Sequence, residues 1–367
     1  MKTKIIISAN SSWNIFNFRH LLLVELIESG FEVVVVAPED EFSGPIEKLG
    51  CKFINLKMDR KSKNPFLSFW TCWRYYKIFK TENPRYYLGF TIKPNIFGSL
   101  AAQLLNINVI NNISGLGSGF LAGGVTKFLI VLLYKFALRR SSVVFFQNSD
   151  DANLFIKERI VEWKQVRLLP GSGVDLEKFK LTPLPNAKKM RFLLISRMLK
   201  DKGIVEFVEA AKIVRTQKPG MEMCLLGPID DGNPSSVTLD NLRKWEYDGI
   251  IRYLGGKNDV RDDITKSHCV VLPSYREGTP RTLLEASAMG RPIITTNVPG
   301  CRQVIEDGKT GYLCEPYDAN DLAEKILKFS ELSFLDMREM GTHARIRAEN
   351  LYDERFILIE YLNAIKS

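Results

Sequence analysis

Short runs rich in β-branched residues alternate with longer segments of helical periodicity along almost the whole chain. Such alternation is typical of βαβ units, whose parallel strands are buried on both faces of a sheet. The strands expected in the first half lie at 4–8, 32–38, 108–112 and 142–149, and the rhythm restarts at 191–197, 221–228, 250–256, 269–274 and 291–297. We therefore expect an α/β protein with two successive Rossmann-like parallel sheets.

The chain has 367 residues, which is too long for one ordinary hydrophobic core. Pro170, Pro183 and Pro185 interrupt every periodic pattern between the two halves, so we place a boundary near residue 172. The expected parts are a first domain at 1–172, a second at 173–350, and a terminal helix at 351–367 that returns to the first domain.

The formal net charge of +9 favours an anionic partner such as a phosphorylated substrate, a nucleic acid or an anionic membrane. The basic residues form no base-reading motif, so a nucleic acid is not expected. The six cysteines lack metal-ligand spacing, which argues against a zinc site or a disulfide framework. The first residues lack the apolar region and cleavage site of a signal peptide, and we expect a cytoplasmic protein.

The strongest motif is CVVLPSYREGTPRTLLEASAMGRPII at 269–294, in which a strand, a loop, a helix and a second strand follow one another. Glu277 lies in the loop and Glu285 inside the helix, with seven residues between them. The helix is expected to begin near Thr279 or Pro280, and its free amides suit a diphosphate. The alternative is a solvated loop glutamate and an ordinary helix carboxylate.

A second motif, LLISRMLKDKGI at 193–204, places Arg197 and Lys202 at the end of an expected strand. A guanidinium fork and an ammonium point charge at that position can neutralise a leaving diphosphate. Taken alone, the pair could equally be two solvated cations in a turn.

Together with GCRQVIEDGKTGYL at 300–313, these motifs resemble the family 4 retaining glycosyltransferases, and the resemblance covers nearly the whole chain. It implies the GT-B architecture of two facing Rossmann-like domains with an interdomain cleft. Arg197, Lys202 and Glu277 would then form the catalytic group at the donor diphosphate and sugar, and Glu285 would bind the ribose. The other donor-binding residues implied are Gly278, Thr279, Arg281, Thr282, Leu283, Gly255, Asn258 and Val260.

Polar strand-end loops of the first half are expected to line the acceptor side. Glycine-rich loops let a ligand approach the backbone closely, although the paired glycines common in the family's first loop are absent here. None of the three histidines lies in these loops, so no histidine-assisted step is expected. The acceptor-side residues expected are Ser11, Ser12, Arg19, Thr91, Lys93, Asn95, Ser114, Gly115 and Gly117. For Arg19, a helix-surface cation is an equally good interpretation.

Two segments mix aromatic or aliphatic residues with cations, at 64–80 and 127–140. Each suits an interfacial helix or, equally, a helix packed on the sheet whose cations reach water. The apolar window at 128–138 is too short to span a bilayer. With the basic balance, we expect peripheral attachment to the inner face of the cytoplasmic membrane.

The function expected from the resemblance is transfer of a hexose or N-acetylhexosamine, GalNAc favoured, in alpha linkage. The donor would be a UDP-sugar and the acceptor an undecaprenyl-diphosphate-linked saccharide of bacterial polysaccharide or glycan assembly. No metal or other cofactor is expected, since the acidic pairs Asp150/Asp151, Asp230/Asp231 and Asp262/Asp263 read as exposed turns and not as D-x-D motifs. The alternatives are a UDP-N-acetylglucosamine 2-epimerase and a catalytically inactive sugar-nucleotide-binding subunit.

Overall fold

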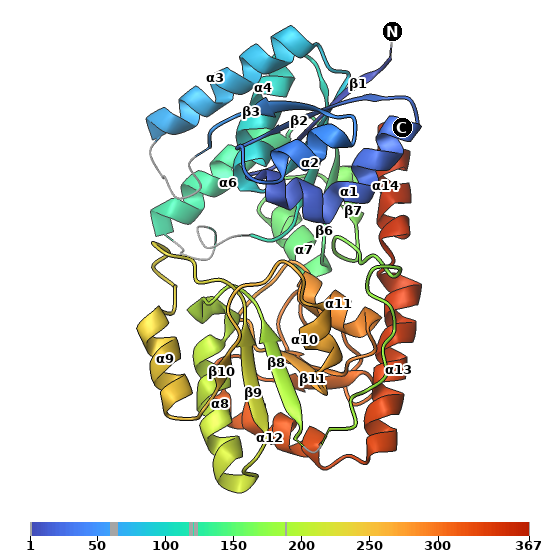
Figure 1. Cartoon of the computed structure of the whole chain (residues 1–367). Coiled ribbons are helices and arrows are strands. Elements are labelled where there is room, and N and C mark those ends of the chain that lie inside the picture. The colour runs from blue at the N-terminus through green and yellow to red at the C-terminus, as the bar shows by residue number, and fades with distance from the viewer. Residues whose placement is uncertain (1, 59–64, 117–119, 121–123, 188, 367) are drawn as a thin grey trace. The chain divides into compact units, whose positions relative to one another are not determined.

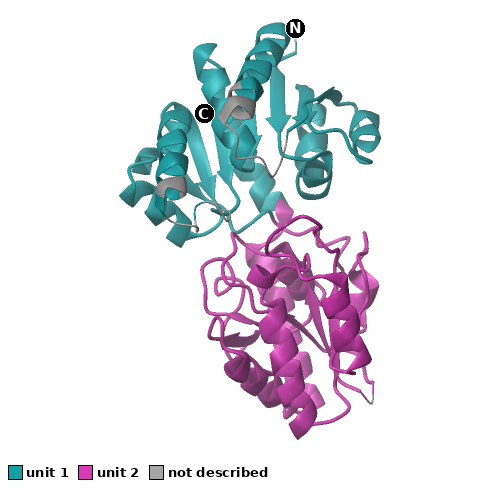
Figure 2. Cartoon of the chain, turned by 90° about the vertical axis from the view of Figure 1, so that its left-hand side faces the viewer, with its two compact units in different colours: residues 1–172, 355–367 teal, residues 173–354 magenta. Residues whose placement is uncertain are grey.

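The computed structural model describes residues 2–58, 65–116, 120, 124–187 and 189–366 (Figure 1). The chain divides into two compact units, coloured separately in Figure 2. Unit 1 comprises residues 1–172 and 355–367, and unit 2 comprises residues 173–354. Each unit is built on one parallel sheet, which confirms the expected fold class.

The sheet of unit 1 has seven parallel strands in the order β3-β2-β1-β4-β5-β6-β7. Its central strands are filled with isoleucine and valine that are buried on both faces of the sheet, as the β-branched runs predict. The strands are β1 (Lys4–Ser8), β2 (Glu32–Ala37), β3 (Lys52–Asn55), β4 (Tyr86–Phe90), β5 (Asn108–Ile113), β6 (Ser141–Phe146) and β7 (Val166–Leu168).

Two helical layers cover this sheet. One core contains Ile6 with residues of α3, α4, α6 and α7, and the other contains Ile5 and Ile7 with residues of α1, α2 and α14. Successive residues of a strand point to opposite faces, so these cores lie on opposite sides of the sheet. The helices are α1 (Ser12–Glu28), α2 (Ser43–Lys48), α3 (Pro65–Glu82), the π-helix η1 (Pro94–Gly98), α4 (Ser99–Leu104), α6 (Gly124–Leu138), α7 (Ser149–Lys157), the short η2 (Trp163–Gln165) and α14 (Glu354–Lys366).

The terminal helix α14 packs on unit 1, although unit 2 separates it from the rest of unit 1 in the sequence. Tyr361 sits edge-on against Phe90 and Phe145, with ring centroids 5.8 and 4.9 Å away. Its hydroxyl accepts a hydrogen bond of 2.6 Å from Nδ2 of Asn112, which is buried. Ring packing and one buried hydrogen bond thus join α14 to strands β4, β5 and β6.

The sheet of unit 2 has six parallel strands in the order β10-β9-β8-β11-β12-β13, around a single core. The strands are β8 (Arg191–Ile195), β9 (Glu222–Leu226), β10 (Arg252–Tyr253), β11 (Cys269–Leu272), β12 (Ile293–Thr296) and β13 (Gly311–Cys314). The helices are η3 (Lys200–Lys202), α8 (Ile204–Gln217), α9 (Leu239–Tyr247), α10 (Arg261–Thr265), α11 (Arg281–Ala288), α12 (Ala319–Ser330) and α13 (Phe334–Leu351).

Within the described ranges, no helix combines the length and the apolar character that crossing a bilayer requires.

Candidate active site

The candidate site lies on the loops that follow β8, β9 and β11 in unit 2. These strands are neighbours and run parallel, so their carboxyl ends meet at one edge of the sheet, where open α/β sheets bind ligands. The β8 loop carries Arg197 and Lys202, and the β11 loop carries Glu277. The predicted catalytic residues therefore come to the same edge.

Lys202 and Glu277 form an ion pair between the β8 and β11 loops. Nζ of Lys202 donates to Oε1 of Glu277, which also accepts a bond of 2.8 Å from Oγ of Ser274. The two charged side chains are only 18% and 14% exposed. Such a shielded pair is stronger than a surface pair, and its ammonium group is held in place.

Gly203 makes the close approach of these two loops possible. Its φ of +72° is left-handed, and a Cβ there would lie 2.1 Å from the carbonyl oxygen of Pro273. The amide of Tyr275 also donates to the carbonyl of Asp201 over 3.0 Å. A residue with a side chain at 203 would separate the turn of Lys202 from the loop of Glu277.

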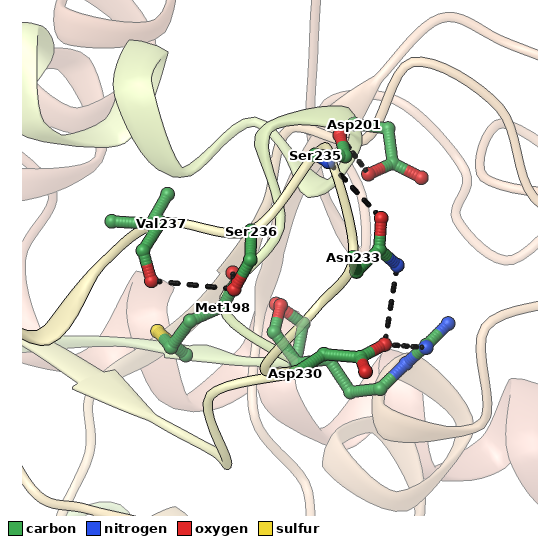
Figure 3. Close-up of polar contacts among 9 residues, drawn as sticks. Met198, Asp201, Asp230, Asn233, Ser235, Ser236 and Val237 are labelled. Carbon is green, nitrogen blue, oxygen red and sulfur yellow. Dashed lines mark hydrogen bonds and ion pairs between the residues drawn. The ribbon is translucent and has the colours of Figure 1, made fainter.

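Arg197 is paired with Asp230, from the loop after β9, and not with either glutamate of the motif. Its Nη1 lies 2.6 Å from Oδ2 of Asp230, whose side chain is 23% exposed (Figure 3). The interpretation of the acidic pairs as exposed turns is wrong for Asp151 and Asp263, which are buried in helices, and Asp230 is half-buried. Asp151 lies in the first turn of α7, and Asp263 binds Lys257.

Helix α11 begins at Arg281 after Pro280, as the sequence predicts, and buries Glu285. Nε of Arg281 donates to Oε1 of Glu285 over 3.0 Å. Burial raises the pKa of Glu285, and the attraction of Arg281 opposes that rise without cancelling it. Glu277 and Glu285 thus enter separate ion pairs, one on each side of the start of α11.

The remaining predicted donor residues flank this helix start and the loop after β10. Thr279 donates its hydroxyl to the carbonyl of Gly278 over 3.0 Å, Thr282 is half-buried, and Leu283 is fully buried. Gly255 is left-handed, with φ +73°, and accepts a bond of 2.8 Å from the amide of Gly227. Asn258 is exposed, and Val260 precedes α10.

The segment after β12 packs against the loop of Glu277. The amide of Glu277 donates to the carbonyl of Pro299 over 3.2 Å, and a Cβ at Gly300 would lie 2.4 Å from the carbonyl oxygen of Glu277. The segment after β12 therefore holds the backbone of this glutamate in place.

Four of the predicted acceptor-side residues are buried in unit 1. Ser11 caps α1 by accepting from the amide of Asn14, and Ser12 donates to the carbonyl of Pro38 over 2.7 Å. Asn95 bonds the carbonyl of Asn112. Arg19 is 6% exposed, and its guanidinium carbon lies 4.4 Å from the centre of the Phe90 ring. The interpretation of Arg19 as a surface cation is therefore wrong.

The other acceptor-side residues lie where β4 and β5 end. Thr91 is left-handed, with φ +65°, which is unusual for a β-branched residue, and its hydroxyl accepts from the amide of Asn10. Lys93 is half-buried, Ser114 is exposed, and Gly115 has φ +139°. Gly117 lies outside the described residues.

Among the residues that the structure describes, no group of three or more His, Cys, Asp or Glu side chains is placed to ligate a metal.

Two protein families match the chain. Residues 177–347 match the family described as Glycosyl transferases group 1, and residues 4–148 match the family Glycosyl transferase 4-like. The first range lies within unit 2 and contains every predicted donor-side residue. The second lies within unit 1.

Two bacterial proteins are similar to this chain over most of its length. The chain is 29% identical, over 95% of its length and 94% of the other, to N,N'-diacetylbacillosaminyl-diphospho-undecaprenol alpha-1,3-N-acetylgalactosaminyltransferase of Campylobacter jejuni. It is 26% identical, over 81% of its length and 77% of the other, to an Escherichia coli UDP-Gal:alpha-D-GlcNAc-diphosphoundecaprenol alpha-1,3-galactosyltransferase. The crystal structure of Anabaena Alr3699/HepE with UDP and glucose superposes with a TM-score of 0.79 at 17% identity, covering 100% of both chains.

Proposed function

Because the chain belongs to the group 1 glycosyl transferases, with a glycosyl transferase 4-like first half, we propose that it transfers N-acetylgalactosamine from a UDP-sugar to an undecaprenyl-diphosphate-linked saccharide. The anomeric configuration is retained and an alpha linkage is formed. The observation that carries this proposal is the shielded Lys202–Glu277 pair at the carboxyl edge of the unit 2 sheet. The choice of sugar and acceptor follows the relative from Campylobacter jejuni, which this chain matches over 95% of its length.

The proposed chemistry places positive charge where negative charge develops. As the bond from the sugar C1 to the phosphate oxygen breaks, the leaving UDP gains negative charge, which Lys202 and Arg197 stabilise. The amides at the start of α11 add to this stabilisation. The acceptor hydroxyl oxygen forms the new bond to C1 on the same face of the sugar, and its proton passes to the departing phosphate. These groups act without a metal in our proposal, and no protein nucleophile is assigned.

A donor panel tests the proposal. The purified protein is incubated with several UDP-sugars and an undecaprenyl-diphosphate saccharide, and lipid products are identified by mass spectrometry. We expect an added N-acetylhexosamine only with UDP-GalNAc, and an alpha linkage by NMR. Epimerised UDP-sugar without lipid product would favour the isomerase, and an unchanged donor would favour a binding subunit.

Unit 1 carries a surface that suits the membrane in which such an acceptor resides. The layer formed by α3, α4 and α6 exposes large apolar side chains: Trp70, Trp73, Leu104, Phe128, Leu129, Leu132, Leu133 and Phe136. Gln103 of α4 donates to the carbonyls of Phe136 and Ala137, so α4 and α6 are in contact. Exposed apolar residues gathered in this way mark an interaction surface.

The charges beside this surface favour anionic lipid as its occupant. The range of α6 contains no acidic residue and is followed by the exposed Arg139 and Arg140, while α3 presents the exposed Arg74, Lys77 and Lys80. Cations beside an apolar helix face are typical of a helix lying in the membrane interface. We propose peripheral attachment, at the inner face of the cytoplasmic membrane, through this layer.

Vesicle flotation tests the attachment. We expect the protein to float with phosphatidylglycerol-containing vesicles and less with phosphatidylcholine alone. Leu129→Glu combined with Leu133→Glu should abolish flotation, whereas Leu335→Glu, at an exposed leucine of α13, should not. Equal flotation of all three proteins would contradict the assignment.

A further inference from the structure

The loop between β9 and α9, residues 228–237, is bound along the β8 loop that carries both predicted cations (Figure 3). The amide of Met198 donates to the carbonyl of Pro228, and the amide of Val237 donates to the carbonyl of Met198, each over 2.9 Å. The amide of Lys200 donates to the carbonyl of Ser235 over 2.8 Å. The two loops therefore form one hydrogen-bonded unit.

Gly227 permits this contact where β9 ends. A Cβ at this glycine would lie 1.8 Å from the carbonyl oxygen of Ser196, and its φ is +145°. The loop of Asp230 can therefore leave the sheet directly beside the residue that precedes Arg197.

Asp230 is held from two directions at once. Its Oδ2 accepts from Nη1 of Arg197 at 2.6 Å and from Nδ2 of Asn233 at 3.2 Å. Oδ1 of Asn233 accepts from the amide of Ser235 over 3.0 Å, and Oγ of Ser235 donates to Oδ1 of Asp201 over 2.9 Å. Figure 3 shows these contacts following one another from Asp230 through Asn233 and Ser235 to Asp201. Besides Arg197, a residue of its own loop thus binds the carboxylate of Asp230.

The pairing uses a small part of the Arg197 guanidinium. A guanidinium carries five N–H donors in a rigid fork, and Asp230 accepts from Nη1. The arginine side chain is 55% exposed, so the Asp230 contact leaves much of it open to solvent. One carboxylate can therefore orient the group while its other donors stay available to a phosphate.

We propose that Asp230, supported by Asn233, is a positioning residue that holds Arg197 ready for the donor diphosphate. This rests on the proposed function, in which Arg197 binds that diphosphate. A free arginine side chain loses rotamer entropy when it binds, and a carboxylate that restricts it beforehand reduces this loss. Neutralising Asp230 therefore weakens binding of the anionic donor, although removal of a negative charge by itself would strengthen it.

Calorimetric titration with UDP tests this inference in the full-length protein. We expect Asp230→Asn to weaken UDP binding about fivefold to tenfold. Asn233→Ala leaves the charge in place and should weaken binding by a smaller factor. Asp240→Asn, at an exposed residue in the first turn of α9, removes the same charge and should leave the affinity unchanged or slightly higher.

A double-mutant cycle with Arg197→Ala separates positioning from a general structural role. Arg197→Ala alone should weaken UDP binding, and Asp230→Asn should have no further effect in that background. In transfer assays the donor KM of Asp230→Asn should rise while the acceptor KM stays constant. Thermal melting checks that each variant is folded.

The outcomes distinguish this inference from the function on which it rests. If Arg197→Ala binds UDP like the natural chain, the proposed role of Arg197 is wrong. If Arg197→Ala weakens binding but Asp230→Asn binds as well or better, Asp230 competes with phosphate and does not position the arginine. An equal loss from Asp230→Asn with and without Arg197 would also overturn the inference.

Discussion

At the scale of single residues, the candidate site contains a carboxylate whose burial is unfavourable. Glu285 is 9% exposed, and its pKa is raised because burial disfavours the charged form more than Arg281 favours it. An acid whose pKa is raised on folding destabilises the folded state at pH values above its ordinary pKa. This cost is present at neutral pH, and it disappears as the pH falls through the raised pKa of the carboxyl group. A carboxylate kept at such a cost is a candidate for a binding role.

The predicted effect of Glu285→Gln follows from this sign. At pH 7 the variant should be at least as stable as the natural chain, with a Tm higher by about 1–3 °C, and should bind UDP about tenfold more weakly. Melting curves and UDP titration measure both effects. Glu209→Gln, at an exposed helix position, should change neither. A lower Tm combined with unchanged UDP binding would contradict the assignment.

At the scale of elements, the turn of η3 joins the β8 loop to α8 and presses against the β11 loop. Gly203 ends this turn and begins α8. The position of Lys202 beside Glu277 thus depends on one residue that has no side chain.

Gly203→Ala should lower the free energy of unfolding by about 2–5 kcal/mol, because strain of the left-handed backbone and overlap with Pro273 add together. Gly220 is a matched control, since its φ is +102° and no atom lies within 4 Å of a Cβ placed there. Gly220→Ala should cost only the backbone strain, about 1–2 kcal/mol. Urea unfolding compares the two variants, and equal losses would show that the contact with Pro273 is unimportant.

At the scale of the whole molecule, the last helix completes the first unit. Ile357, Tyr361 and Ile365 of α14 are buried in the same core as β1, β4 and β6. The core on this face of the unit 1 sheet is therefore incomplete until the residues of α14, which follow unit 2 in the sequence, have been synthesised.

Removal of residues 355–367 should destabilise unit 1 and spare unit 2. Hydrogen exchange followed by mass spectrometry should show loss of amide protection in β1, β4 and β6, with protection in β8, β9 and β11 preserved. The milder Tyr361→Phe removes the bond from Asn112 and should lower the stability of unit 1 by about 1–2 kcal/mol. Unchanged protection in unit 1 after truncation would contradict this account.

Much of the fold could be predicted because the strands of the sheet centres are runs of buried β-branched residues. The prediction did not list β3, β7 and β13 as strands, and it marked β4 only through the polar loop that follows it. The edge strands β3 and β7 have only four and three residues and include polar side chains, while β13 begins at Gly311, a residue type that is common in turns. Their strand conformation comes from pairing with a neighbour, which one segment of sequence does not reveal.

The part of the candidate site that lies in one continuous segment, the loop of Glu277 and the helix of Glu285, could be predicted from the sequence. The pairing of Arg197 with Asp230 was not, since it joins residues 33 positions apart through neighbouring strands. A polar pair after a strand looks the same in sequence whether it is solvated or packed on the next loop. The roles assigned to all these residues stay predictions until they are tested.

Stabilisation of a departing nucleoside diphosphate by cations is central to the proposed function, and transfer kinetics of Lys202→Ala measure it directly. With UDP-GalNAc and a lipid-linked acceptor, we expect kcat to fall about 100-fold while UDP affinity falls less than about tenfold, because the lysine acts mainly on charge that develops in the transition state. Lys212→Ala, at an exposed position of α8, should keep the natural rate. A natural kcat for Lys202→Ala would contradict the central claim.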